Sequence, residues 1–192
     1  MRARDNPFRS DRVLAVRYRL LHGTWEDLFA QLEALGFRAA IVGPQGSGKT
    51  TLLEDLKPRL EAGGFSVREL RLDTESPSFE PEFLEDLFAT LGSHEVILFD
   101  GAEQLKWAEW VRFERRSRAA AGLVITSHRP GLLPTLLETT TTPELLRGLV
   151  DQILGDRAAE LRPLLPGILE RHRGNVRESL RELYDHFAAV AG

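Results

Sequence analysis

Cysteine is absent from this chain of 192 residues. Its absence excludes disulfide bonds and thiolate metal sites. The five histidines also lack the short spacings of metal-binding pairs, such as His-x-x-x-His. No apolar run approaches the roughly 20 residues that span a bilayer, and no apolar stretch follows the basic start, as a secretory signal requires. We therefore expect a cytoplasmic protein without membrane contact.

An excess of positive charge is lacking too. The net charge is -4 at pH 7, which argues against a general nucleic-acid-binding protein, because phosphate neutralisation dominates such binding. Arginines nevertheless gather near the start of the chain and again in one later stretch: Arg2, Arg4, Arg9, Arg12, Arg17, Arg19, and Arg115, Arg116, Arg118. We interpret both groups as solvated basic surfaces or a flexible arm. DNA stays an open partner.

A glycine-rich stretch carries the strongest signal in the sequence. It reads Gly43-Pro44-Gln45-Gly46-Ser47-Gly48-Lys49-Thr50 and matches the phosphate-loop pattern. Backbone N–H groups of such a turn point inward as an anion cradle, and the following helix adds its positive end. Lys49 is expected to reach the terminal phosphates of a nucleotide, and the Thr50 hydroxyl to bind Mg2+. We predict a nucleoside triphosphate site over residues 43–51, ending at Thr51, with magnesium as the only metal.

The flanks of this loop fit the same interpretation. Residues 38–42 form a short apolar run that predicts a strand entering the loop. Leu52, Leu53, Leu56 and Leu60 fall on one helical face and predict the helix that leaves it. Pro58 is expected to kink or shorten this helix, because proline lacks an N–H and its ring clashes one turn back.

Strand and helix patterns alternate along most of the chain. They predict a helix after the N-cap Thr24, an edge strand over 65–72, helices over 81–91 and 104–121, and strands over 95–100, 122–126 and 136–140. Beyond Thr142 the pattern is helical to the end. We predict a P-loop NTPase fold of the α/β class, in three layers around a parallel sheet of about five strands. The predicted parts are an N-terminal arm (1–22), the nucleotide-binding domain (23–142) and a helical lid (143–192).

Asp100 ends an apolar strand at the sheet edge where α/β proteins bind ligands. We pair Asp100 with Thr50, because the second carboxylate of a phosphate-loop enzyme orients magnesium and its waters. Glu103 follows three residues later. It either polarises the attacking water or caps the next helix, and both interpretations stay open.

The next strand ends in Thr126-Ser127-His128-Arg129. This strand end is expected beside the strand that carries Asp100. Thr126 or Ser127 is therefore a candidate sensor of the terminal phosphate, with His128 or Arg129 approaching it. The equal alternative is that these polar groups cap the end of the strand.

The stretch Gly174-Asn175-Val176-Arg177 begins the last predicted helix, with Asn175 as N-cap and Glu178 at the capping-box position. Arg177 falls in the first turn, where a positive charge opposes the helix dipole by typically ~0.3–1 kcal/mol. Such a placement suits a residue that faces an anion. The alternative is a surface ion pair with Glu182 or another nearby acid.

Together these motifs resemble the AAA+ ATPases and the related STAND signalling ATPases, from about Thr24 to the end of the chain. In that family a Gly-Asn-x-Arg motif begins a lid helix and its arginine contacts the terminal phosphate, so the resemblance implies this role for Arg177. The stretch from Leu98 to Glu103 also resembles the Asp-Gly-x-Asp-Glu version found in NACHT-type members.

The resemblance implies a magnesium-dependent ATPase that acts as a nucleotide-driven switch or small motor component. Its ligands are ATP and ADP, and its catalytic set is Lys49, Asp100, Glu103, Thr126 and Arg177. Gly101 stands where the usual pattern has glutamate, so hydrolysis is expected to be slow or to use Glu103. No Asn-Lys-x-Asp motif is present, which favours adenine over guanine.

Two other functions stay open at the level of sequence. One is a P-loop kinase in which Arg115, Arg116 and Arg118 hold a small acceptor. The other is a non-catalytic adaptor that contacts protein or DNA through the arginine-rich start or through the helix containing Trp107 and Trp110. The protein partner and the oligomeric state stay undetermined.

Overall fold

A parallel sheet of five strands lies at the centre of unit 2, the larger of two units into which the chain divides. Its strands are β1 (Arg38–Val42), β2 (Ser66–Arg71), β3 (Glu95–Asp100), β4 (Gly122–Ser127) and β5 (Thr135–Glu138). Their order is β2-β3-β4-β1-β5, and each neighbouring pair is parallel. The predicted α/β class and the sheet of about five strands are thus confirmed.

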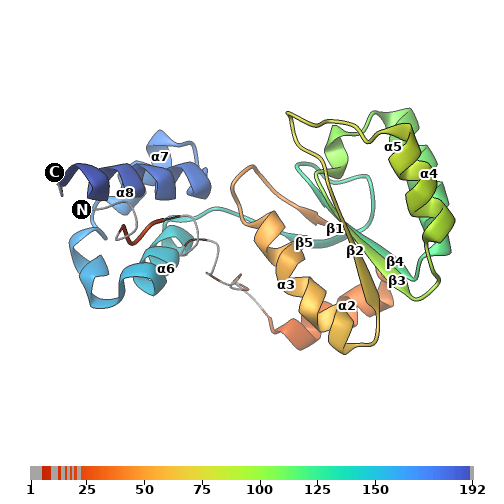
Figure 1. Cartoon of the computed structure of the whole chain (residues 1–192). Helices are drawn as coiled ribbons and strands as arrows, with labels where there is room; N and C mark the ends of the chain where they lie inside the picture. The colour runs from red at the N-terminus through yellow and green to blue at the C-terminus, as the bar shows by residue number, and fades with distance from the viewer. Residues whose placement is uncertain are drawn as a thin grey trace. The chain divides into compact units, whose positions relative to one another are not determined.

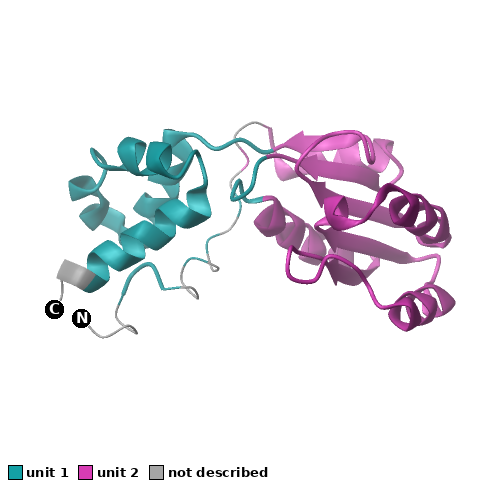
Figure 2. Ribbon diagram, turned by 90° about the horizontal axis from the view of Figure 1, so that it is seen from above, with its two compact units in different colours: residues 1–18, 44–48, 139–192 teal, residues 19–43, 49–138 magenta. Residues whose placement is uncertain are grey.

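The computed structural model describes residues 6–9, 13, 16, 18, 20 and 23–190. Unit 1 comprises Met1–Tyr18, Pro44–Gly48 and Thr139–Gly192, and unit 2 comprises Arg19–Gly43 and Lys49–Glu138 (Figure 2). The predicted division at 22/23 and 142/143 stays a prediction. Of the arginine-rich start, the predictions for Arg2, Arg4, Arg12, Arg17 and Arg19 lie outside the described residues.

The middle strands of the sheet are buried on both faces. Every residue of β4 is buried, and Phe99 of β3 has 0% exposure. Strand β2 carries the charged residues Arg68, Glu69 and Arg71 and lies at the edge of the sheet, as predicted. Charged side chains suit an edge strand because they discourage pairing with another chain.

Helices cover the two faces of this sheet (Figure 1). Helices α2 (Trp25–Ala34) and α3 (Lys49–Ala62) lie on one side, and α4 (Pro81–Thr90) and α5 (Trp107–Arg116) on the other. Helix α2 begins at the predicted N-cap Thr24, whose hydroxyl accepts the N–H of Asp27 in a reciprocal capping box. The three predicted layers are therefore present.

Two helix predictions need correction. Helix α3 is not shortened at Pro58 but continues to Ala62, because the buried Leu56 and Leu60 hold it against the sheet on both sides of the proline. The predicted kink stays a prediction. The helix predicted over 104–121 is three shorter elements: η2 (Ala102–Gln104), α5 and η3 (Ser117–Ala119). Trp110 is 3% exposed and belongs to the core, but Trp107 is 69% exposed.

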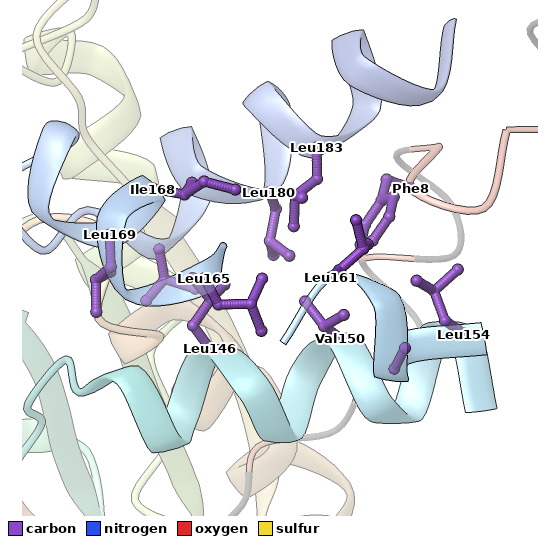
Figure 3. Close-up of a cluster of buried hydrophobic side chains, with 12 residues drawn as sticks. Phe8, Leu146, Val150, Leu154, Leu161, Leu165, Ile168, Leu169, Leu180 and Leu183 are labelled. Carbon is purple, nitrogen blue, oxygen red and sulfur yellow. The ribbon is translucent and has the colours of Figure 1, made fainter. Parts of the chain in front are cut away.

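Unit 1 is helical and has its own core (Figure 3). Its elements are α6 (Pro143–Leu154), η4 (Gly155–Glu160), α7 (Leu165–Arg171) and α8 (Val176–Val190). The predicted N-cap Thr142 accepts the N–H of Leu145 at 3.1 Å. In the described part of the chain, no helix has both the length and the apolar character needed to cross a membrane.

The start of the chain contributes to this helical core. Phe8 is 3% exposed among the apolar side chains of α6, α7 and α8. Its ring centroid lies 5.5 Å from that of Phe187, and the Asn6 side-chain amide donates to the carbonyl of Tyr184 at 2.8 Å. Residues 6–9 therefore pack with the C-terminal helices.

Candidate functional site

Two glycines give the phosphate loop its conformation. Gly46 has φ 75° and Gly48 has φ 87°, a left-handed region that side chains disfavour. A Cβ on Gly48 would lie 3.1 Å from the ring of Tyr18, within unit 1. Burial raises the pKa of Tyr18 above its ordinary value. The ring therefore lies against the loop as a neutral group.

Lys49 begins α3 and is 8% exposed. Its ammonium donates to the carbonyl oxygen of Gly43 at 2.8 Å, and the Gly43 N–H donates to the carbonyl of Ser127 at 3.1 Å. The lysine charge is thus held at the point where β1 enters the loop. Thr51 is half-buried one residue after Thr50.

Thr50 and Asp100 come together as the pairing hypothesis expects. The Thr50 hydroxyl donates to Asp100 Oδ2 at 2.9 Å, and only 16% of the Asp100 side chain is exposed. These elements meet because α3 follows β1 and packs on the sheet that contains β3. A hydroxyl and a carboxylate oxygen are hard ligands of the kind that Mg2+ prefers.

Thr126 supports Asp100 from the neighbouring strand. Its hydroxyl donates to Asp100 Oδ1 at 2.6 Å and accepts the N–H of Gly101 at 2.8 Å. Because the single hydroxyl proton is used on Asp100, Thr126 fixes the carboxylate. The hydroxyl of Ser127 donates to the carbonyl of Arg129 at 2.8 Å and closes the turn after β4. Both contacts match the strand-end alternative.

Glu103 lies in η2, directly after the turn that follows Asp100. Its Oε1 lies 3.2 Å from His128 Nδ1 at the end of β4, while its Oε2 is buried and has no hydrogen-bond partner within the described residues. The turn requires Gly101, which has φ 85° and whose Cβ would overlap the carbonyl oxygen of Leu72. A glutamate at position 101 would not fit. The first acidic side chain after the turn is therefore that of Glu103.

One neighbour of Asp100 was missed by the sequence reasoning. Arg71 is opposite Asp100 in the register of β2 and β3, and its Nε lies 3.9 Å from Asp100 Oδ2. A cavity of about 190 Å³ is lined by Thr50, Arg71 and Asp100, among others. The sequence alone does not predict this contact, because it does not determine the register in which two strands pair.

The loop and the last helix also meet within unit 1. A Cβ on Gly46 would overlap the side-chain oxygen of Asn175. Asn175 caps α8, since this oxygen accepts the N–H of Glu178 at 3.2 Å, as predicted for an N-cap. Gly46 therefore provides the space that the cap of α8 occupies.

Arg177 is exposed in the first turn of α8 and makes no ion pair with any residue that the structure describes. Its alternative partner, Glu182, is bound by Arg171 and by His172, whose Nε2 lies 2.7 Å from the carboxylate. These hydrogen bonds, that of Arg171 first, lower the pKa of Glu182. The surface-pair interpretation of Arg177 therefore lacks its expected acceptor.

Thr50 and Asp100 are too few to hold a metal ion by themselves, but they suit Mg2+, which also takes ligands from water and substrate. Across the described ranges, no group of three or more His, Asp or Glu side chains could hold a metal ion. Thr50 and Asp100 offer one hydroxyl and one carboxylate. Mg2+ fits such a sparse set, because it usually keeps several waters and takes substrate phosphate oxygens as further ligands.

Comparison with known proteins gives matches in structure alone. No protein-family model matches the chain, and no curated protein sequence matches it. Two variants of RuvB from Thermotoga maritima, one lysine-to-arginine and one threonine-to-valine, match with TM-scores of 0.58 and 0.54 at 17% and 19% identity. They cover 88% and 87% of this chain and 65% and 62% of theirs.

A DNA replication initiation factor matches with a TM-score of 0.53 at 16% identity, covering 82% of this chain and 58% of its own. The chain thus spans less than two thirds of each of these three proteins. At such low identities the likeness establishes the fold alone. That fold is a P-loop NTPase-like α/β fold, with a five-stranded parallel sheet flanked by helices.

Proposed function

We propose that the protein binds ATP with Mg2+ and hydrolyses it slowly as a nucleotide-driven switch. The observation that carries this proposal is the 2.9 Å hydrogen bond between Thr50 and Asp100. It joins the residue after the loop lysine to the carboxylate at the end of β3. A P-loop NTPase fold and an intact loop sequence support the same function.

The loop residues would bind the nucleotide through their backbone. The backbone N–H groups of residues 45–48 would supply donors to phosphate oxygens, and the positive φ of Gly46 and Gly48 lets the backbone turn toward them. Lys49 would exchange the carbonyl oxygen of Gly43 for a terminal phosphate oxygen. That exchange replaces a dipole by an ionic partner, so it favours bound nucleotide.

Thr50 and Asp100 would hold the magnesium, with Thr126 fixing the carboxylate from behind. When bound, Mg2+ neutralises charge that develops on the transferred phosphoryl group. The buried hydrogen bond from Thr126, at 2.6 Å, keeps one carboxylate oxygen in place. Asp100 Oδ2 then points toward Thr50 and is available to the metal or to one of its waters.

Glu103 would accept the proton of the attacking water. Its buried Oε2 lacks a partner among the described side chains, and such an oxygen favours a group that donates a hydrogen bond. Its Oε1 is engaged by His128. We expect slow turnover, because the acid arrives three residues after Asp100 rather than next to it.

Arg177 would report the state of the nucleotide to the helices of unit 1. It is exposed and has no ion-pair partner in the described part of the chain. The resemblance to AAA+ proteins gives its counterpart a contact with the terminal phosphate. In this proposal, loss of that phosphate releases Arg177 and changes what the helices present to a protein partner.

Calorimetry with ATP and Mg2+ tests binding, and phosphate release on the same samples tests hydrolysis. We would compare the wild type with Lys49→Ala, Arg177→Ala and the matched control Lys57→Ala, which removes an exposed lysine from the same helix. We expect the wild type, Arg177→Ala and Lys57→Ala to bind ATP, and Lys49→Ala to lose ATP binding. Arg177→Ala should keep binding but lose turnover.

Other outcomes distinguish the alternatives. If the wild type binds no ATP, or if Lys57→Ala behaves like Lys49→Ala, the nucleotide proposal fails and the adaptor function gains. Transfer of the γ-phosphate to an added metabolite would favour the kinase. That alternative already loses two of its three arginines, since Arg116 is paired with Glu85 and Arg118 with Glu114.

A further inference from the structure

A groove of about 460 Å³ opens between α4 and α5, which lie side by side on one face of the sheet (Figure 1). Its apolar lining includes Phe79, Leu84, Phe88, Leu105 and Phe113. No residue of the proposed nucleotide site lines it. The volume lies in the range of roughly 300–1,000 Å³ that is typical of ligand sites, enough to hold a few side chains.

The floor of the groove is a rigid aromatic cluster. Phe113 is 3% exposed, and its ring centroid lies 5.1 Å from that of the fully buried Phe99. Phe88 meets Phe113 edge-on at 5.3 Å, and Phe79 lies 5.4 Å from Phe99. Because these rings are anchored in the core, the groove is preformed and an occupant need not order it.

The carboxylates on the rim already have partners. Glu85 accepts two hydrogen bonds from Arg116, at 2.7 and 3.1 Å, and this pair links α4 to α5. The hydrogen bond from Arg116 lowers the pKa of Glu85. Glu109 accepts the backbone N–H of Lys106 at 3.0 Å. Arg116 also lies over the ring of Phe88, 4.4 Å from its centroid.

Two arginines of the rim are free by comparison. Arg112 and Arg115 lie one turn apart on α5 and are exposed. Neither makes an ion pair or hydrogen bond with a residue in the described ranges. Since Arg116 is paired with Glu85, the α5 rim carries Arg112 and Arg115 against the single charge of Glu109. Its net charge is therefore positive, on a chain whose net charge is -4.

The opposite wall limits what can pair with these arginines. Helix α4 and its N-cap carry four acids, Glu80, Glu82, Glu85 and Asp86, of which Glu85 alone lines the groove. An extended polyanion such as a nucleic-acid strand would run past the groove and meet the negative charge of α4 and its N-cap while it contacted α5. A ligand with a few carboxylates on one side and apolar groups on the other avoids that repulsion.

We propose that the groove binds a short acidic segment of a protein partner. One or two large apolar side chains of that segment enter between α4 and α5 and pack on Phe79, Phe88 and Phe113. Carboxylates beside them pair with Arg112 and Arg115. Apolar burial supplies the affinity, and the two arginines set orientation and specificity.

A phage-displayed library of random linear peptides, selected on the full chain, tests this surface whatever the identity of the partner. Enriched peptides are then measured by fluorescence anisotropy against the wild type, Arg112→Glu/Arg115→Glu and the control Arg147→Glu. Arg147 is an exposed arginine on α6, in the other unit. The milder pair Arg112→Gln/Arg115→Gln removes the two charges without reversing them, and Leu84→Ser changes the apolar lining of the groove. Far-UV circular dichroism shows whether each variant is folded.

We expect enriched peptides that combine Trp, Phe or Leu with neighbouring Asp or Glu. Charge reversal should weaken them at least about tenfold, as expected for central arginines of an interface, while Arg147→Glu binds normally. The proposal is overturned if no peptide is enriched above an unrelated protein, or if the enriched peptides are basic. Equal binding by the charge-reversed and wild-type proteins would overturn it too, as would displacement of the peptides by an excess of single-stranded DNA.

Discussion

Replacement of Thr126 by valine removes one hydroxyl from the support of Asp100 and leaves the shape of the side chain nearly unchanged. The hydroxyl is buried, with the residue 1% exposed. It donates to Asp100 at 2.6 Å and accepts from Gly101 at 2.8 Å. In the valine variant, a carboxylate oxygen and a backbone N–H both lose their partner inside the protein.

The expected cost follows from these two losses. A hydrogen bond to a charged group contributes about 1.5–3 kcal/mol, and a buried unsatisfied donor costs about 1–3 kcal/mol. Both hydrogen bonds are made by the same hydroxyl, so the two costs are not independent and do not simply add. We therefore expect Thr126→Val to lower the free energy of unfolding of unit 2 by about 2–3 kcal/mol. Thr126→Ser keeps the hydroxyl and loses a methyl group, so it should cost only about 1 kcal/mol.

Tryptophan fluorescence in urea is the assay, because all three tryptophans, Trp25, Trp107 and Trp110, belong to unit 2. The midpoint should fall in the order wild type, serine variant, valine variant. ATP affinity in magnesium should fall in the same order if Asp100 holds the metal. A serine variant as unstable as the valine variant, or a valine variant as stable as the wild type, would refute this account of Thr126.

Three further changes test other parts of the chain. Gly101→Ala should lower the free energy of unfolding of unit 2 by several times as much as the control Gly64→Ala, as measured by urea unfolding. Both glycines have positive φ, which costs alanine about 1–2 kcal/mol. Only at position 101 would the added Cβ also overlap Leu72. Glu95→Gln should lower stability at neutral pH, since the hydrogen bond from Arg68, and then that from the Gly92 N–H, lowers the pKa of Glu95 below 4.5. A lowered folded-state pKa stabilises above the unfolded-state value, so the difference between variant and wild type should shrink as the pH falls through that window, and a constant difference would contradict it. Phe8→Ala should cost about 3–5 kcal/mol in unit 1, seen as faster hydrogen exchange over residues 143–188 with an unchanged tryptophan transition, and unchanged exchange there would show that Phe8 is not part of that core.

Local signals were enough to predict much of the fold. The caps at Thr24 and Thr142 and the buried strand ending at Asp100 follow from residues close together in the sequence, and the structure contains all three. The order of the strands also agrees with a charged β2 at the edge. Such features depend on short-range geometry and on hydrophobic periodicity, which a single sequence records.

Features that depend on long-range register could not be predicted. Arg71 lies beside Asp100 only because β2 and β3 pair in one particular register. Glu103 lies beside His128, and Phe8 packs among helices far away in the sequence. These contacts also join residues that are distant in the sequence, so no local pattern predicts them. The continuation of α3 past Pro58 shows that packing of flanking leucines outweighs the local cost of proline. For the candidate site, the sequence indicated the residue types, and the structure adds their partners.

The place of Phe8 in the core of unit 1 bears on how the chain is made. Asn6 and Tyr184, which hold this segment to α8, are 178 positions apart. On a ribosome that builds the protein from its N-terminus, the strands of unit 2 leave the exit tunnel long before Tyr184 is synthesised. Phe8 therefore stays exposed to solvent or to a chaperone until α8 emerges. Unit 1 can close only after translation of α8, so we expect unit 1 to complete its folding after unit 2.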